Sequence, residues 1–307
     1  MSLLLDLQQV THDYGSFRAL HGVTLQIPVG AVGLVGQNGA GKSTLMQILL
    51  GLIRPSQGTA RVLGLDVRTA GAELRGRVGY MPERAALVPG LNGIEYAALA
   101  GELCGMPRRQ ALRRAHETLS HLGLEDARYR RLDQYSLGMT QRLKLAATLV
   151  HDPDLLLLDE PTSGLDPEGR AAMLSLLSAL ARRPGKSLLL ASHLLGDIEM
   201  VCGSTIILHQ GRVLSVGTIS ELRSQRSRGY RLEWQGSGRA FLNALRDAGA
   251  TVVDDDADGR ARALVPADWQ TRRFFALAAA HAAPLTHLEA EEEDLEAIYH
   301  RVIAQGR

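Results

Sequence analysis

The amino-acid sequence predicts an α/β protein in which a large region with a mostly parallel, helix-covered sheet is followed by a small α+β domain. Apolar segments of strand length alternate with helix-length segments, which is typical of a sheet buried on both faces. A glycine-rich stretch, GQNGAGKS at 36–43, joins one such strand to a helix. A Ser/Arg-rich stretch at 223–228 separates the two regions, so we predict domains at 2–222 and 229–307.

The first region is predicted to begin with strands and tight turns and to end in strand–helix alternation. Short apolar segments bounded by Gly, Pro or polar residues indicate strands, and Gly51 and Pro55 indicate the end of the first helix. The predicted strands are 3–10, 20–27, 31–35, 154–158, 187–191, 205–208 and 213–216. The predicted helices are 43–53, a helical stretch between 94 and 150, 167–182 and one from 194.

The second region is predicted to form a split βαβ, ferredoxin-like domain. Its expected order is strand 230–234, helix 239–248, strand 251–254, strand 260–265, helix 268–281, strand 285–289 and helix 294–303. Asp258-Gly259 matches a hairpin turn between the two middle strands. The acidic run at 254–258 lacks EF-hand ligand spacing, so a solvated turn is favoured over a calcium loop. The acids at 289–296 are those that a helix N-terminus favours.

Composition excludes several functional classes. The formal net charge of the 307 residues is +1, which gives no overall attraction to nucleic acid, and we expect no nucleic-acid partner. No apolar run approaches the roughly 18–20 residues that cross a bilayer, and the apolar start is broken at Asp6. We therefore expect no membrane span and no targeting segment. Cys104 and Cys202 are too few for a disulfide framework and are expected to be buried thiols in a reducing cytosol.

The stretch GQNGAGKS has the GxxxxGKS pattern of a phosphate-binding loop. Glycines let consecutive backbone N–H groups point inward around phosphates, at the N-terminus of a helix whose dipole favours anions. Lys42 is expected to reach the β- and γ-phosphates, and the Ser43 hydroxyl to hold Mg²⁺. We therefore predict an ATP site with Mg²⁺, whose loop residues are Gly36, Asn38, Gly39, Gly41, Lys42, Ser43 and Thr44. Lysine occurs only at positions 42, 144 and 186, while arginine is used almost everywhere else.

A second motif, LLLLDE at 155–160, ends a buried apolar strand with two carboxylates. Ligands bind at the carboxyl ends of strands in α/β sheets. Asp159 suits a Mg²⁺ ion, directly or through water, and Glu160 suits a base that polarises the attacking water. Solvated acids at the end of a strand are common, but a strand this apolar about a hundred residues after a phosphate loop favours the catalytic interpretation.

Over residues 2–222 the sequence resembles the nucleotide-binding subunits of ATP-binding-cassette (ABC) transporters. Five further stretches match the motifs of that family, in the family's order. They are the aromatic Tyr14, VGYMPE at 78–83, the signature-like YSLGMTQR at 135–142, SGLD at 163–166 and Ser192-His193. Alone, Tyr14 or His193 is an ordinary residue; taken in order with both nucleotide motifs, the set is specific.

The resemblance implies the fold and the roles of these residues. It implies a P-loop NTPase cassette with a RecA-like core, an antiparallel β subdomain and a helical subdomain. Tyr14 would stack on adenine, and 78–83 would be the loop that joins the ATP core to the helical subdomain. In a head-to-tail dimer, Ser136, Gly138 and Gln141 would contact the ATP of the opposite cassette, and Asp166 would lie across the interface. His193 would contact the γ-phosphate and the catalytic water.

Two positions depart from the commonest family pattern. Glu83 stands where a glutamine contacts Mg²⁺ or the water, so we expect the same catalytic and metal-binding role with altered charge. Leu137 replaces the first glycine of the signature. Because Ser136, Gly138 and Glu160 remain, the departures put the rate in doubt more than the activity.

The resemblance also implies partners. Since no membrane span is expected, a separate permease is implied, with the chain peripheral on the cytoplasmic face of the inner (plasma) membrane. Residues 84–95 are the first candidates for the permease contact, and a second copy of the cassette is expected. The ending LEAEEEDLEAIYHRV resembles cassettes that serve drug, antibiotic and polysaccharide exporters, where an appended domain would contribute dimer contacts or regulation.

Two other functions remain open. A soluble ABC ATPase acting on DNA or the ribosome usually carries two cassettes in one chain, long coiled coils or basic extensions, and this sequence shows none of these features. A regulatory ATP-binding subunit that closes without turnover is disfavoured by Glu160 and His193, whereas Glu83 and Leu137 keep it open. The transported substrate is not encoded in this chain.

Overall fold

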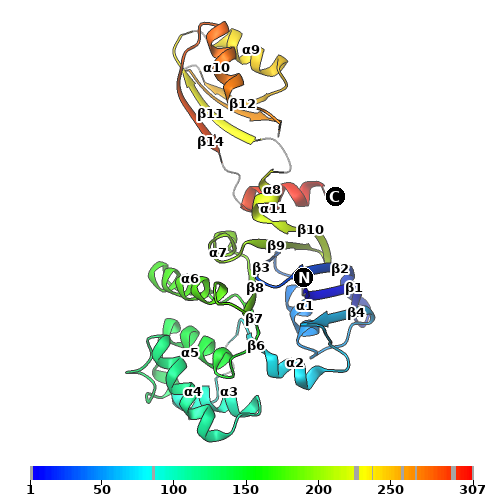
Figure 1. Cartoon of the computed structure of the whole chain (residues 1–307), viewed down its shortest axis with the longest axis vertical. Helices are drawn as coiled ribbons and strands as arrows, with labels where there is room; N and C mark the ends of the chain where they lie inside the picture. Colours follow the sequence, from blue (N-terminus) through cyan, green and yellow to red (C-terminus); the bar gives the residue numbers. More distant parts are fainter. Residues whose placement is uncertain are drawn as a thin grey trace. The chain divides into compact units, whose positions relative to one another are not determined.

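The structure is a computed structural model, and it describes residues 3–84, 87–224, 228–236, 238–256, 259–266, 268–291 and 295–305. Its internal contacts divide the chain into two compact units, Met1–Gly217 and Thr218–Gln305 (Figure 1). The predicted boundary at residue 222 stays a prediction, and the contacts group the helix α8 (Ile219–Ser224) with the second unit.

The first unit is built on a six-stranded sheet with the order β10-β9-β3-β8-β7-β6. The four pairs among β9, β3, β8, β7 and β6 are parallel. Their bounds are β3 Ala31–Val35, β6 Val78–Met81, β7 Leu155–Asp159, β8 Ser187–Ser192, β9 Ser204–His209 and β10 Arg212–Thr218. Every residue of β7 and β8 is buried, which is why both strands are nearly continuous apolar runs.

A second, antiparallel sheet of the first unit has the order β2-β1-β4-β5. Its strands are β1 Leu3–Tyr14, β2 Phe17–Pro28, β4 Gln57–Val62 and β5 Leu65–Asp66. One apolar core, which includes Leu34, Met46 and Leu157, joins this sheet to β3, β7 and the helix α1 (Lys42–Leu49). The strands β4 and β5 and the helix α2 (Gly71–Arg77) were not predicted, because QGTARV buries only two side chains and GAELRGR only one.

The helical part of the first unit contains α3 (Gly93–Leu103), α4 (Arg108–His121), the short η1 (Leu132–Gln134) and α5 (Leu137–Leu149). Asn92 and Glu95 form a reciprocal capping box that begins α3. The helices α6 (Pro167–Ala181) and α7 (Leu195–Val201) follow β7 and β8. The prediction that VGYMPE is a loop is wrong for its first four residues, which pair with β7 as the sheet strand β6.

The second unit contains the element order predicted for it. It comprises β11 Arg228–Trp234, α9 Arg239–Asp247, β12 Thr251–Asp256, β13 Arg260–Val265, α10 Arg272–Ala280, β14 Leu285–Glu291 and α11 Leu295–Gln305. The antiparallel sheet has the order β12-β13-β11-β14 and packs on an aromatic core that includes Trp234, Phe241 and Phe274. Asp258 of the predicted hairpin turn lies outside the described residues.

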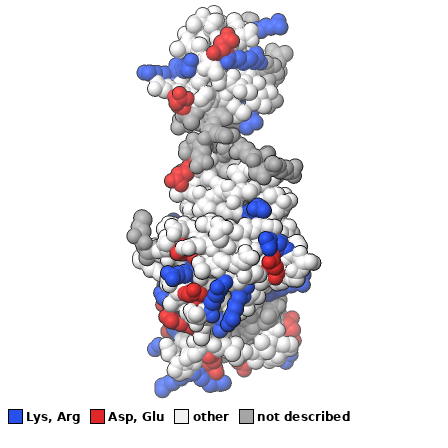
Figure 2. Space-filling model, turned by 90° about the vertical axis from the view of Figure 1, so that its right-hand side faces the viewer, with Lys and Arg blue, Asp and Glu red and all other residues white. Residues whose placement is uncertain are grey.

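The prediction of two buried thiols is wrong for one of them. Cys202 is buried, whereas Cys104 is exposed because it caps the C-terminus of α3, where Gly105 turns the chain away. Among the described residues, no helix has both the length and the apolar character needed to cross a membrane. On the face drawn in Figure 2, the basic and acidic side chains of the first unit are interspersed.

Candidate nucleotide-binding site

The loop GQNGAGKS runs from the end of β3 to the start of α1, as predicted. Gly39 and Gly41 have φ of 80° and 102°, which side chains rarely tolerate. A Cβ at Gly41 would also lie 2.9 Å from the Ala19 carbonyl oxygen, and one at Gly36 would lie 2.5 Å from that of Leu208. The loop therefore needs glycine for its conformation at two positions and for close packing at Gly36 and Gly41.

Lys42 is held inside the loop that precedes it. Its Nζ donates to the carbonyl oxygens of Gly36 at 2.6 Å and Gln37 at 3.3 Å, and the residue is buried. The ammonium therefore lies within the ring of backbone atoms that forms the loop. A phosphate entering the loop would meet a cation whose position is fixed by backbone contacts.

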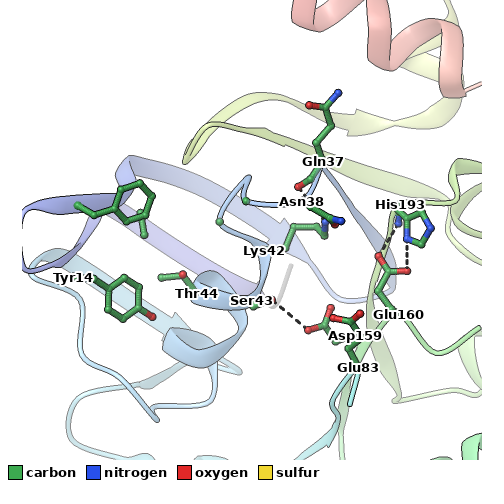
Figure 3. A pocket seen from close by; sticks show the side chains of 14 residues that line it. Tyr14, Gln37, Asn38, Lys42, Ser43, Thr44, Glu83, Asp159, Glu160 and His193 are labelled. Carbon is green, nitrogen blue, oxygen red and sulfur yellow. Dashed lines mark hydrogen bonds and ion pairs between the residues drawn. The ribbon is translucent and has the colours of Figure 1, made fainter. Parts of the chain in front are cut away.

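Three carboxylates converge opposite the loop (Figure 3). Asp159 and Glu160 come from the end of β7, and Glu83 follows β6. Burial, together with the charges of Glu160 and Glu83, raises the pKa of Asp159 above its ordinary value, while Lys42 and Ser43 act in the opposite direction. This like-charge cluster is unfavourable by itself and would be relieved by a cation.

Glu160 is fixed by the residues that follow β8. One carboxylate oxygen accepts from the His193 backbone N–H at 2.8 Å, and the other lies 2.8 Å from the His193 ring Nδ1 (Figure 3). The Glu160 N–H also donates to the Ala191 carbonyl at 2.9 Å. Glu160 has φ of 49°, an uncommon conformation for a residue other than glycine, and such strain concentrates at functional sites.

These residues line one cavity of about 390 Å³. Of the predicted site residues it contains Tyr14, Asn38, Gly39, Gly41, Lys42, Ser43, Thr44, Glu83, Asp159, Glu160 and His193. Figure 3 shows Tyr14 on the side of the loop away from the carboxylates. Its hydroxyl donates to Gln47 at 3.3 Å, and its ring meets His12 edge-on.

Sequence reasoning missed Phe17, Ala19 and Gln37, which also line this cavity. Phe17 is 64% exposed, so its ring is open to the cavity beside Tyr14. The signal in the sequence was an aromatic residue three positions after Tyr14. Its exposure, which makes it a candidate ligand contact, is a feature of the structure.

The residues present fit a Mg²⁺ ion bound together with a nucleotide. The Ser43 hydroxyl donates to the Asp159 carboxylate at 3.5 Å, so two hard oxygen ligands already face each other. The described residues contain no group of three or more His, Cys, Asp or Glu side chains arranged to hold a metal by themselves. Mg²⁺ typically takes one or two protein oxygens and completes its coordination with phosphates and water.

A second cavity, of about 480 Å³, lies between the N-termini of α5 and α6. It contains the predicted residues Ser136, Gly138 and Asp166. Ser136 accepts from the Met139 N–H at 3.3 Å and caps α5, and Asp166 accepts from the Gly169 N–H at 2.8 Å and caps α6. Among the described residues, none lines both cavities.

Two predicted site residues line neither cavity. Gly36 is buried at the base of the loop, where its role is close packing against Leu208. Gln141 is buried and donates through its amide to the Ser163 carbonyl at 3.2 Å, which ties the signature helix α5 to the loop before α6. The structure therefore places Gln141 as a link between two segments of the second cavity.

Leu137 is compatible with an open signature surface. It is half exposed, and its side chain extends toward Gly164, where a Cβ would approach it to 2.9 Å. Gly164 has φ of 74°, so glycine there serves both the turn and the leucine. The leucine thus adds an apolar contact between the signature and the SGLD loop.

Comparisons with known proteins identify the family. A family model described as ABC transporter matches residues 20–163. The daunorubicin/doxorubicin resistance ATP-binding protein DrrA of Streptomyces peucetius is 41% identical over 69% of this chain, although the match spans only 64% of DrrA. The bacitracin transport ATP-binding protein BcrA of Enterococcus faecalis is 30% identical over 100% of this chain and 98% of its own length.

A solved structure agrees in fold. The ATP-binding cassette MJ0796, in a dimeric post-hydrolysis state bound to ADP and Pi, is 25% identical and has a TM-score of 0.64. The match covers 70% of this chain and 98% of that one. With the phosphate loop, the carboxylate strand, the signature and His193 in one unit, the chain belongs to the ATP-binding subunits of ABC transporters, a family of ATPases.

Proposed function

We propose that this chain hydrolyses ATP to ADP and phosphate at a composite site shared by two copies, and thereby drives a separate membrane permease. The observation that carries the proposal is the division of the predicted site into two cavities. The phosphate loop and carboxylates line one, and the signature and SGLD loop line the other. A second cassette turned head-to-tail would bring the two kinds of surface together around one ATP.

In the first cavity the residues have distinct tasks. Lys42 and the loop N–H groups bind the phosphates, while Tyr14 and Phe17 offer aromatic faces to the base. Glu160 accepts a proton from the water that attacks the γ-phosphate, and His193 holds the Glu160 carboxylate through ring and backbone. Mg²⁺, when bound by Ser43 and Asp159, supplies charge neutralisation at the phosphate oxygens.

The second cavity suits recognition of the γ-phosphate from the partner's ATP. Backbone N–H groups at a helix N-terminus and the dipole of α5 favour an anion near Ser136 and Gly138. An ATP held between two copies would stabilise the closed dimer, and loss of the γ-phosphate would remove that bridge. ATP binding and hydrolysis would therefore shift the population between closed and open dimers.

Residues 84–95 are the proposed contact with the permease. Residues 85 and 86 lie outside the described part of the chain, and the remainder leads from Glu83 to the start of α3. Val88 is 40% exposed, which provides an apolar point of contact. A partner bound to this segment would sit one residue from the catalytic cavity. The names of DrrA and BcrA support export of a drug or antibiotic as the transport task.

The regulatory alternative, closure without turnover, makes a different prediction for ATPase activity. Steady-state hydrolysis by the purified complex should exceed that of Glu160→Gln by at least about 10²-fold, because the variant lacks the base. Glu73→Gln, which changes an exposed acid in α2, is the matched control and should behave as wild type. Equal rates for wild type and Glu160→Gln would refute the enzyme proposal. The proposed permease partner is tested separately, by whether a multi-span membrane protein co-purifies with this chain.

A further inference from the structure

Lys144 is a buried cation that the mechanism above does not use. It lies on the signature helix α5, is 4% exposed, and is one of only three lysines in the chain. Its Nζ donates to the carbonyl oxygen of Glu83 at 2.9 Å. A buried ammonium is unfavourable unless it is paired or hydrogen-bonded. The bond to the Glu83 carbonyl meets part of this requirement, and it joins the lysine to a predicted catalytic residue.

The contact belongs to a row of polar contacts between α5 and β6. The Thr148 hydroxyl, one turn after Lys144, lies 2.8 Å from the Lys144 carbonyl of its own helix and 3.3 Å from the Tyr80 carbonyl, and the ring of His151 lies 3.3 Å from the Val78 carbonyl. β6 is the last strand in the sheet order, and side chains of α5 and of the residues just after it meet its carbonyl groups. Lys144 extends this row past the strand to the loop that carries Glu83.

Lys144 also interacts electrostatically with two carboxylates of the catalytic cavity. Burial lowers its pKa to about 8, while the carboxylates of Asp159 and Glu83 act in the opposite direction. Lys144 thus interacts with Asp159 and Glu83 from the signature helix, whereas Lys42 acts on Asp159 from the phosphate loop.

We propose that Lys144 is a positioning residue that fixes Glu83 from the signature helix, so that the position of α5 determines where the Glu83 carboxylate lies relative to Asp159. This inference deepens the proposed function, and it takes for Glu83 the role that the family resemblance implies, contact with Mg²⁺ or the attacking water. An arginine does not replace the lysine equivalently, because one compact ammonium meets a single carbonyl at this point and a planar guanidinium requires more room. Lys144 thus links the surface that senses the partner's ATP to the carboxylates that act on the chain's own ATP.

The test is a double-mutant cycle in the full-length chain with Lys144→Met, Glu83→Ala and the double variant. Lys144→Met should lower kcat about tenfold or more with a smaller change in KM for ATP, because Glu83 is misplaced but the phosphate loop is intact. In the Glu83→Ala background the same substitution should cause little further loss, since no side chain remains to be positioned. Equal losses in both backgrounds would show that Lys144 is only structural and would overturn the inference.

Two further variants control for the loss of a hydrogen-bonded lysine in general and for the loss of charge alone. Lys186→Met is the matched control, because Lys186 donates to the carbonyls of Asp152 and Pro153 at 2.9 and 2.8 Å and lies outside the cavity. It should leave kcat unchanged. Lys144→Gln retains an N–H donor without charge and should fall between wild type and Lys144→Met. If Lys144→Met does not fold, the same double-mutant cycle is measured with Lys144→Gln in its place, and the comparison between the two Glu83 backgrounds is made with that variant.

A second readout separates this inference from the proposed function. The rise in melting temperature caused by MgATP should fall in Lys144→Met and should be unchanged by that substitution in the Glu83→Ala background. If wild type shows no hydrolysis, the ATPase proposal fails, and this binding cycle still decides the role of Lys144. Equal reductions in both backgrounds would contradict the inference even if hydrolysis is normal.

Discussion

The two cavities of the first unit differ in what their residues can do. The loop cavity gathers a fixed cation, Lys42, three carboxylates and a hydroxyl around a strained backbone. The signature cavity is formed by the beginnings of α5 and α6, whose N-caps are Ser136 and Asp166. The first holds groups suited to proton transfer and metal binding, and the second offers helix N-termini suited to an anion.

Under the proposed function, this difference explains why one copy would be an incomplete catalyst. Ser136 uses its hydroxyl to cap its own helix, and the described residues of its cavity include neither Glu160 nor Lys42. The chemical groups are preorganised within the chain, whereas in the proposed dimer a second copy would bring the signature surface to them. Variants in the loop cavity should therefore act on chemistry, and variants in the signature cavity should act on closure.

The largest effect within the loop cavity, after loss of Glu160 itself, is expected for His193→Ala. Without the ring contact, the Glu160 carboxylate keeps only its backbone partner from this residue, so kcat should fall by up to about 10²-fold. ATP binding should change little. His193→Asn, whose amide reaches toward the same oxygen, should retain more activity than His193→Ala. Loss of ATP affinity equal to the loss of kcat would mean that His193 acts in binding.

Asp159→Asn should separate metal binding from folding. Because the folded chain raises the pKa of Asp159, it binds the carboxyl proton more tightly than the unfolded chain does. The free energy of unfolding therefore falls as pH rises from the ordinary pKa of an aspartate to the raised pKa of the folded chain. The ligand-free variant should therefore be at least as stable as wild type at pH 7, with the difference shrinking toward about pH 4, near the ordinary pKa of an aspartate. Thermal unfolding should show a much smaller MgATP-induced shift in the variant. A full shift would exclude Asp159 as a metal ligand.

The smallest expected effect distinguishes two glycines of the loop. Both have positive φ, which costs a residue with a side chain roughly 1–3 kcal/mol. Gly41→Ala also brings a Cβ within 2.9 Å of the Ala19 carbonyl, while a Cβ at Gly39 meets no atom within 4 Å. Chemical denaturation should rank Gly41→Ala below Gly39→Ala in free energy of unfolding. The reverse order would mean that the contacts around Gly41 yield to a methyl group without cost.

The sequence predicts strongly periodic or fully buried elements well. LLLLD and the alternating segments of the second unit agree with the predicted ranges within a few residues, because their apolar pattern records burial directly. The strands β4 and β5 escape prediction because their residues are largely polar and owe their conformation to pairing with β1 and with each other. VGYM is mistaken for a loop because its strand character depends on the neighbouring β7.

For the site, the sequence motifs predict which residues line the cavities, whereas the hydrogen bonds between these residues and their neighbours are known only from the structure. Eleven predicted residues line the loop cavity and three the signature cavity. Two hydrogen bonds depend on tertiary packing, and no sequence motif predicts them. They are the bond from Gln141 to the Ser163 carbonyl and the bond from Lys144 to the Glu83 carbonyl. Phe17 belongs to no family motif, and its exposure beside the cavity is known only from the structure.

The central claim, a site completed by a second copy, is tested most directly by mixing two inactive variants. Lys42→Ala loses the loop cation, and Ser136→Asp keeps a good helix cap while placing a like charge against the γ-phosphate. Each variant alone should hydrolyse ATP at background rate. In a mixed dimer, the intact loop of one copy meets the intact signature of the other, so the mixture should regain ATPase activity. A mixture that stays as inactive as its components would show that each chain uses its own signature and would contradict a shared site.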